Sequence, residues 1–169
     1  MMDNTTINKP RTDEAFFAMI KNPLKFRLFL WQKLPAAYFS GLKVSYADEE
    51  KAEVSIPYKW FTRNPFRSTY FACLSMAAEM STGILALSNI YQRTPKVSML
   101  VVAVEGKFYK KAIGKTKFVC KDGQSIMQSI QLAIDSGAPQ TIRAVSSGFN
   151  EQNELIAEFW VTWSFKAKQ

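Results

Sequence analysis

The chain has 169 residues, of which 47% are hydrophobic and 21% charged, and its formal net charge is +8. These proportions exclude an intrinsically disordered chain and fit one domain with a single core. The sequence contains no histidine and no Cys-x-x-Cys pair, so we exclude zinc sites and catalytic dyads built on imidazole, and we expect no metal.

The positive charge would attract any polyanion, but it is spread along the chain. The densest cluster, "KFYKKAIGKTK" from Lys107 to Lys117, alternates with apolar residues. It fits a strand with a solvated basic face and an anion site about equally well. No nucleic-acid-binding motif occurs, so we expect no nucleic acid partner.

Residues 1–12 are polar and without periodicity, which predicts a frayed tail before a single domain over 13–169. Thr12 is positioned to cap a short helix with an apolar face formed by Phe16, Phe17 and Ile20.

A second helix is expected to begin at Pro23 and to end at Pro35. Its apolar residues recur at helical spacing: Leu24, Leu28, Trp31 and Leu34. We favour packing of this face against the domain over binding to a membrane surface.

After Gly41 the hydrophobic period changes to two, which indicates strands. The turn-like "ADEE" separates two such segments and predicts a hairpin, with these residues facing the core: Leu42, Val44, Tyr46, Ala52, Val54 and Ile56. The segment from about 70 to 90 is apolar on nearly all sides, which is typical of a central helix in a soluble fold, and we expect no membrane span.

Beyond Pro95, "KVSMLVVAVEGKFYKK" predicts a long strand with a bulge at Gly106, and "KTKFVC" predicts the next strand. A helix is expected at about 123–137, with Ile126, Ile130 and Ile134 in line. The end of the chain alternates regularly, with the apolar residues Leu155, Ala157, Phe159, Val161, Trp163 and Phe165 on one face. The sequence therefore predicts an α+β domain with an antiparallel sheet buried on one side.

This order of elements resembles the hotdog fold of the thioesterase and dehydratase superfamily, in which a sheet wraps around a long central helix. Over roughly Leu34 to Phe165 the chain is similar to the small acyl-CoA thioesterases of the phenylacetate-pathway branch and their uncharacterised relatives. In that branch an Asn precedes a loop that ends in His-Gly-Gly, and an acid follows nine residues after the His. Asn64 and Glu79 stand at the Asn and acid positions here, which implies that they are catalytic.

In place of His-Gly-Gly this chain has Tyr70, Phe71 and Ala72. The resemblance implies that backbone amides at the start of the central helix polarise a thioester carbonyl, with Glu79 as general base or nucleophile. It also implies an acyl-CoA or another acyl thioester as substrate, no cofactor besides the coenzyme A of that substrate, and a homodimer, with further pairing into a tetramer left open. The alternative is a non-catalytic protein that binds acyl-CoA, fatty acid or lipid.

The remaining candidates lie near the helix start or on the strand that leaves the helix. For the oxyanion or the substrate they are Tyr70, Phe71, Ala72, Ser68, Thr69 and Thr82. For the phosphates of coenzyme A they are Arg63, Arg67, Lys107, Lys110 and Lys111. Ser68 and Thr69 also fit as N-caps of the central helix.

Glu79 has a second interpretation, as a structural acid bonded to Ser75 or Thr82, or paired with Arg63 or Arg67. The abundance of Phe and the two N-terminal helices predict a long apolar acyl group, with those helices closing over it. Cys73 and Cys120 both fall in apolar segments, which predicts a reduced, cytoplasmic setting.

Overall fold

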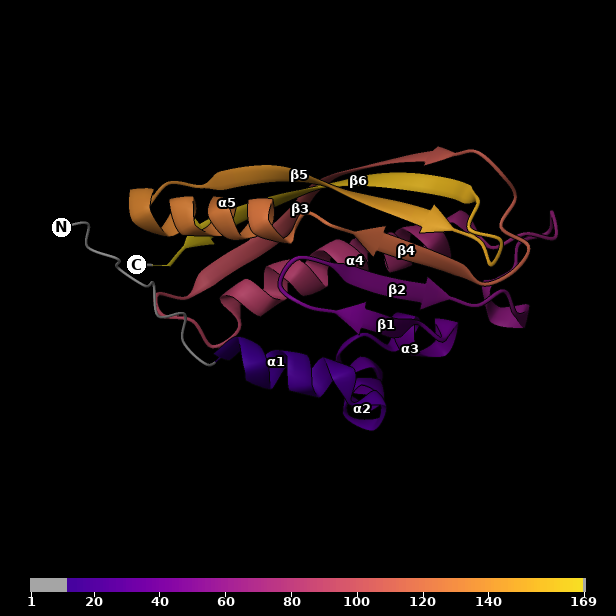
Figure 1. Ribbon diagram of the computed structural model, residues 1–169, viewed down its shortest axis with the longest axis horizontal. Helices are drawn as coiled ribbons and strands as arrows, with labels where there is room; N and C mark the ends of the chain where they lie inside the picture. Colours follow the sequence, from indigo (N-terminus) through magenta and orange to yellow (C-terminus); the bar gives the residue numbers. More distant parts are fainter. Residues whose placement is uncertain (1–11, 169) are drawn as a thin grey trace.

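The computed structural model describes residues 12–168, so the predicted tail lies outside the described residues except for Thr12, the first residue of helix α1. Six strands form one antiparallel sheet in the order β1-β2-β4-β5-β6-β3, and a long helix packs on one face of it (Figure 1). The strands are β1 Lys43–Ala47, β2 Ala52–Ile56, β3 Val97–Phe108, β4 Thr116–Cys120, β5 Gln140–Phe149 and β6 Leu155–Ala167. The α+β prediction is therefore confirmed.

The long helix is α4, Phe71–Ile90, and it contacts strands β2, β4, β5 and β6. Residues 80–86 are buried without interruption, as expected for a helix that is apolar on nearly all sides. By length and composition α4 could also cross a membrane, but 67% of its most apolar window is buried inside the protein. It is the core helix of the domain.

Helix α5, Gly123–Ser136, packs against α4, β5 and β6. Ile126 and Ile130 are fully buried on its inner face, and the helix ends at Gly137 in the left-handed conformation. Strand β6 buries alternate residues as its sequence predicts, from Ala157 to Phe165. Both elements were predicted correctly because their patterns have one apolar face only.

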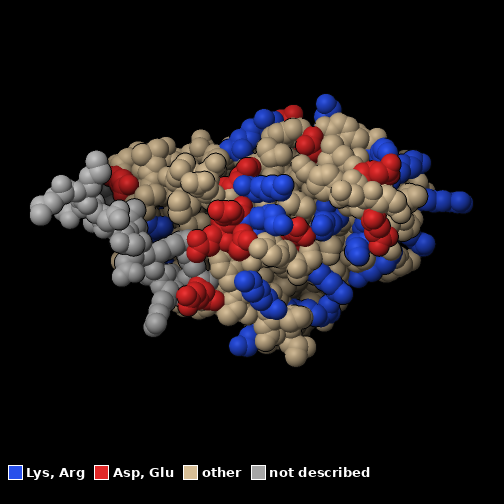
Figure 2. Space-filling model, in the orientation of Figure 1, with Lys and Arg blue, Asp and Glu red and all other residues tan. Residues whose placement is uncertain are grey.

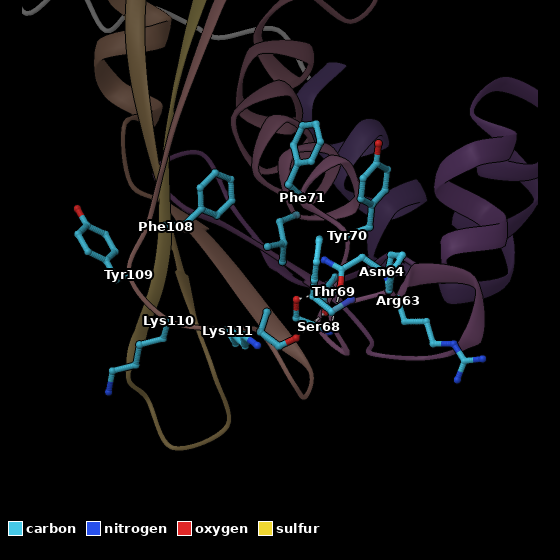
Figure 3. A pocket seen from close by; sticks show the side chains of 14 residues that line it. Arg63, Asn64, Ser68, Thr69, Tyr70, Phe71, Phe108, Tyr109, Lys110 and Lys111 are labelled. Atoms are coloured by element: carbon cyan, nitrogen blue, oxygen red, sulfur yellow. Dashed lines mark hydrogen bonds between the residues drawn. The ribbon is translucent and has the colours of Figure 1, made fainter.

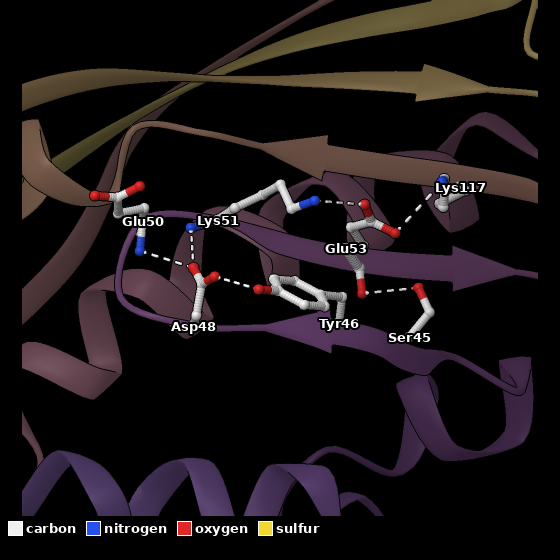
Figure 4. A network of polar contacts seen from close by, with 7 residues as sticks. All are labelled: Ser45, Tyr46, Asp48, Glu50, Lys51, Glu53 and Lys117. Atoms are coloured by element: carbon white, nitrogen blue, oxygen red, sulfur yellow. Dashed lines mark hydrogen bonds and ion pairs between the residues drawn. The ribbon is translucent and has the colours of Figure 1, made fainter.

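The β1–β2 hairpin forms, but one of its strands departs from simple alternation. The register between β1 and β2 shifts between Val44 and Tyr46, so Ala47 faces the core and Tyr46 is exposed. Exposed Tyr46 donates its hydroxyl to Asp48, whose carboxylate also accepts the backbone N–H groups of Glu50 and Lys51 (Figure 4). The prediction that Tyr46 is buried was wrong.

The bulge predicted at Gly106 lies at another position in the structure. In β3 the register shifts between Val101 and Ala103, whereas Gly106 pairs regularly with Phe159. A Cβ at Gly106 would lie 2.8 Å from the Phe159 ring, so this glycine permits a close approach of that ring. Strand β3 is an edge of the sheet, and four of its apolar side chains are exposed: Leu100, Val102, Val104 and Phe108.

The N-terminal helices α1, Thr12–Lys21, and α2, Pro23–Lys33, lie together beside the sheet, and α1 contacts both β1 and α4 (Figure 1). Two short elements were not predicted: α3, Pro35–Ser40, and the 3-10 turn η1, Trp60–Thr62. Pro35 therefore begins a helix as well as ending one, in keeping with its fixed φ at a first helical position.

The apolar face of α1 packs inward as predicted, with Phe16, Phe17 and Ile20 buried. Helix α2 uses the opposite face from the one predicted. Its buried residues are Phe26 and Leu30, and the four residues expected to pack are exposed: Leu24, Leu28, Trp31 and Leu34.

Candidate functional site

The loop before α4 is held together by Asn64. Its side-chain oxygen accepts the backbone N–H groups of Phe66 at 3.0 Å and Ser68 at 3.2 Å, and the Ser68 hydroxyl at 3.2 Å (Figure 3). Arg67 completes the turn in the left-handed region, at φ 60°. These contacts support a role for Asn64 in shaping the loop.

Ser68 and Thr69 do not cap α4, contrary to the prediction. Tyr70 occupies the N-cap position and makes no side-chain cap. The N–H and hydroxyl groups of Thr69 both donate to the carbonyl of Ala112, at 2.8 and 3.1 Å, which ties the loop to the segment between β3 and β4. The side chains of Ser68 and Thr69 are thus occupied by contacts that position the helix start.

The first turn of α4 consequently keeps free backbone donors. Tyr70 donates its N–H to Thr62, and Cys73 and Leu74 donate to the Tyr70 carbonyl. Within residues 12–168 the N–H groups of Phe71 and Ala72 have no acceptor. Such donors at a helix start, where the helix dipole is positive, suit a developing oxyanion.

An open cavity of about 820 Å³ lies at this end of α4. Figure 3 shows it between the loop before the helix and the segment that ends β3, with Tyr70 and Phe71 at its edge. It brings together eight of the predicted residues, Arg63, Asn64, Ser68, Thr69, Tyr70, Phe71, Lys110 and Lys111. Five others do not line it: Arg67, Ala72, Glu79, Thr82 and Lys107.

The sequence interpretation missed Phe108 and Tyr109 as cavity residues. The signal available in the sequence was the presence of these two aromatic residues within the basic cluster from Lys107 to Lys117. The hydroxyl of Tyr109 donates to Glu158 at 2.7 Å, and this bond to a carboxylate raises the pKa of Tyr109. The Tyr109 hydroxyl therefore stays protonated and is held in place by Glu158, while its ring contributes apolar surface to the cavity.

The cations around this cavity are not equivalent. Lys110 pairs with Glu154 at 2.6 Å, and Lys107 lies over the Tyr109 ring at 5.4 Å from its centroid. Arg63 and Lys111 have no carboxylate partner among the described residues. They are the cations left available for an anionic ligand at the rim.

Glu79 lies in the third turn of α4 and is partly buried. Burial raises the pKa of its carboxyl group above the ordinary Glu value, and no residue of the described chain hydrogen-bonds or pairs with the carboxylate. The Thr82 hydroxyl donates to the backbone carbonyl of Glu79 at 2.8 Å and accepts the indole N–H of Trp163 at 2.9 Å. The structural-acid interpretation fails in this geometry, and Thr82 is committed to contacts within the core.

A second, smaller cavity of about 270 Å³ lies beside Glu79. It is lined by residues of α1, α2, α4, β3 and β6, and apart from Glu79 its walls are largely apolar. Its lining residues include Phe16, Ile20, Phe26, Phe29, Met80, Ile84, Met99 and Trp163. An acid without a partner therefore faces an apolar space beneath the N-terminal helices.

Within one chain, the free amides and the acid are too far apart to act on the same carbonyl group. Phe71 and Glu79 are separated by eight residues, which is about 12 Å along a helix that rises 1.5 Å per residue. Between Phe71 and Glu79, one face of α4 is not covered by the rest of the described chain, and we call it the open strip. In the helix from 72 to 86 the residues that are not buried are Ala72, Ser75, Met76 and Glu79, which share one face.

The fold is shared with solved structures of thioesterase-like proteins. A probable thioesterase of Pseudomonas aeruginosa, of unknown function, aligns over 87% of this chain and 97% of its own, with a TM-score of 0.73 and 19% identity. A thioesterase of Haemophilus influenzae covers 86% of this chain and 91% of its own, with a TM-score of 0.63 and 15% identity.

The PaaI protein of the E. coli phenylacetic acid degradation operon has a TM-score of 0.63 at 11% identity, covering 94% of this chain and 96% of its own. No protein-family model matches the sequence, and no curated protein matches it. The chain has the hotdog fold that its sequence predicted, and it shares this fold with these thioesterase-like structures.

Proposed function

We propose that the protein is a homodimeric thioesterase that hydrolyses acyl-CoA at sites shared between two subunits. The observation that carries this proposal is Glu79, a carboxyl group with a raised pKa and no partner among residues 12–168, on the open strip of the core helix. The likeness in fold to thioesterases supports the reaction class.

The dimer is supported by two adjacent surfaces that one chain leaves unpartnered. Strand β3 is a long apolar edge strand, and such an edge is a template for pairing with another chain. If two copies meet across a two-fold axis at β3, their α4 helices run antiparallel along the open strips. Ser75 lies halfway between residues 71 and 79, so a crossing there brings Glu79 opposite the partner's Phe71.

In this arrangement one carbonyl group can meet both halves of the site. The N–H groups at the partner's Phe71 and the partner's Ala72 hold the thioester oxygen, while Glu79 takes a proton from water. The hydroxide adds to the carbonyl carbon, the carbon–sulfur bond breaks, and the thiolate takes the proton back from Glu79. The products are a free acid and coenzyme A thiol. A direct attack by the carboxylate, followed by hydrolysis of the anhydride, gives the same products.

The two cavities suit the two ends of such a substrate. The open cavity offers Arg63 and Lys111 to phosphates and the rings of Phe108 and Tyr109 to apolar parts of the coenzyme. The small apolar cavity beside Glu79 suits the acyl group, with α1 and α2 over it. The two free, buried cysteines support a reducing cytoplasm as the location.

A second candidate is a non-catalytic acyl-CoA or fatty-acid binder of the same fold. It is favoured by one feature, the side chain of Phe71, which lines the cavity at the position where the thioesterase pattern has glycine. Both candidates use the same cavities, so binding alone does not separate them.

The test is release of free thiol from short, long and aromatic acyl-CoAs by the wild type and by Glu79→Gln. Turnover that disappears in the variant supports the thioesterase. Tight binding of acyl-CoA by calorimetry without turnover in either protein supports the binder. Equal turnover in both proteins would remove Glu79 from the mechanism.

A further inference from the structure

Helix α2 has two apolar faces, and only one of them packs against the rest of residues 12–168. Phe26 and Leu30 are buried against the domain. Leu24, Leu28 and Trp31 follow one another at intervals of four and three residues, so they form a stripe on the opposite side of the helix. We call these three residues the α2 stripe.

The α2 stripe is open to solvent, with exposed fractions of 81% for Leu24, 53% for Leu28 and 56% for Trp31. Scattered exposed apolar residues are normal, but three in line on one helix, including a tryptophan, form a contiguous patch. None of the three belongs to β3 or to the open strip of α4, so the proposed dimer contact does not use them.

Basic side chains flank the α2 stripe, and α2 has no acidic residue. Lys25 and Arg27 flank the stripe on either side, and Lys21 and Lys33 stand near the two ends of the helix. Figure 2 shows Lys and Arg on both sides of an uncharged tip at the lower edge of the molecule, where Figure 1 places α2.

Exposed aromatic rings continue this surface toward η1. Arg27 lies over the Tyr38 ring at 4.6 Å from its centroid, and Tyr38 contacts Phe39. Phe39 in turn contacts Phe61, which contacts Trp60. Phe39, Phe61 and Trp60 are all exposed, so apolar surface extends from α2 across α3 to η1.

We propose that the α2 stripe and its basic border bind the surface of a membrane that contains anionic lipids. An interfacial helix has this composition, with bulky apolar residues on the face that enters the lipid and Lys or Arg beside them. Lysine and arginine stems can lie along the apolar boundary while their charged ends reach lipid phosphates. The charge argues against a second copy as the occupant, because a two-fold contact at this face would set the same cations against one another.

This docking would give α2 two roles. Its inner residues Phe26 and Phe29 line the small cavity beside Glu79, and its outer stripe would lie in the lipid interface. The cavity would then be held close to the membrane, where acyl chains are abundant. Docking itself does not depend on hydrolysis, so it can be tested whether or not the protein is a thioesterase.

The experiment is sedimentation of the full-length protein with vesicles of phosphatidylcholine alone and of phosphatidylcholine mixed with phosphatidylglycerol. We expect binding to the anionic vesicles that weakens as salt is added. Two double variants remove the two components of the surface, Leu28→Ser with Trp31→Ser and Lys25→Glu with Arg27→Glu. All four side chains are exposed, so the variants are expected to fold, which circular dichroism checks.

Loss of the two apolar side chains should reduce partitioning by on the order of tenfold or more. Reversal of the two charges should reduce it by at least roughly twentyfold, since each basic residue near an anionic surface contributes about fivefold. The apolar control is Leu132→Ser on α5, which has the same exposed fraction as Leu28, 53%. The charge control is Lys96→Glu with Lys121→Glu, two exposed lysines outside α2.

Binding lost in both α2 variants and kept in both controls supports the proposal. Equal losses in the α2 variants and the controls would show only general attraction of a basic protein to a negative surface, and would overturn it. No binding of the wild type to anionic vesicles would also overturn it. So would a fall in molecular mass, by light scattering, in the Leu28→Ser, Trp31→Ser variant, because the stripe would then be a contact between copies.

Discussion

The two cavities along α4 differ in the features that a hydrolase needs. The one at the helix start is open and, as far as the described residues go, has free backbone donors nearby, unpaired cations at its rim and no acidic residue in its lining. The one beside Glu79 is small and apolar, and no donor or cation in the part of the chain that the structure describes is a partner of its acid. Each cavity of a single chain therefore has only part of a hydrolytic site, which is the reason for placing the reaction between two subunits.

The largest effect is expected from Glu79→Gln, which removes the proposed base and keeps the size of the side chain. Turnover of acyl-CoA should fall about 10²- to 10⁴-fold, while the dissociation constant measured by calorimetry changes little. Ser75→Ala, on the same open strip, is the matched control and should retain activity. Retained turnover in Glu79→Gln would leave the apolar cavity as a binding site only.

Ala72→Pro tests the free backbone donors at the start of α4. Proline is tolerated in the first turn of a helix, and the N–H that it removes has no acceptor within the described chain. Turnover should therefore fall about 10²- to 10³-fold with little change in melting temperature. Ala72→Ser keeps the N–H and is the control. A proline variant as active as the serine variant would exclude this amide as an oxyanion donor.

The cations at the open cavity should affect binding more than turnover. Arg63→Ala or Lys111→Ala should raise KM for acyl-CoA by roughly five- to tenfold with kcat nearly unchanged, because charge-assisted contacts to phosphate would be lost. Lys110→Ala is the matched control, since Lys110 is already paired with Glu154. Equal effects in all three variants would indicate a general attraction rather than a phosphate site.

The smallest effect concerns stability. Because burial raises the pKa of Glu79, folding favours its protonated form, and this contribution is fully present below the ordinary Glu pKa of about 4.3. It is lost as pH rises through the raised pKa. Glu79→Gln stays neutral, so near pH 7 it should be more stable than the wild type by on the order of 1 kcal/mol. Thermal unfolding should show this difference disappearing below about pH 4. A variant less stable than the wild type at pH 7 would mean that the carboxylate has a partner in solution.

The fold could be predicted where a segment offers a single apolar face. Strand β6 and helix α5 have one such face each, so their sequences determine which side is buried. Helix α2 could not be predicted in this way, because Leu24, Leu28 and Trp31 are as regular as the residues that it buries. Only the neighbouring elements decide which of the two faces points inward.

The candidate site was predicted in part for a similar reason. The position of Glu79 on the core helix followed from the sequence, but its lack of a partner depends on where Thr82 and Trp163 place their hydrogen bonds. Thr69 is a good N-cap by composition, yet it bonds to Ala112, which is 43 residues away in the chain. Contacts of such long range have no local signature.

In the proposed dimer, each site combines Glu79 of one subunit with the helix start of the other. The most direct test is the activity of a purified mixed dimer, with one Glu79→Gln subunit and one Ala72→Pro subunit. A shared site predicts about half of the wild-type activity per dimer, because one of the two sites then has both an intact Glu79 and an intact Ala72. Activity no higher than the mean of the two inactive parents would contradict the claim and confine each site to a single chain.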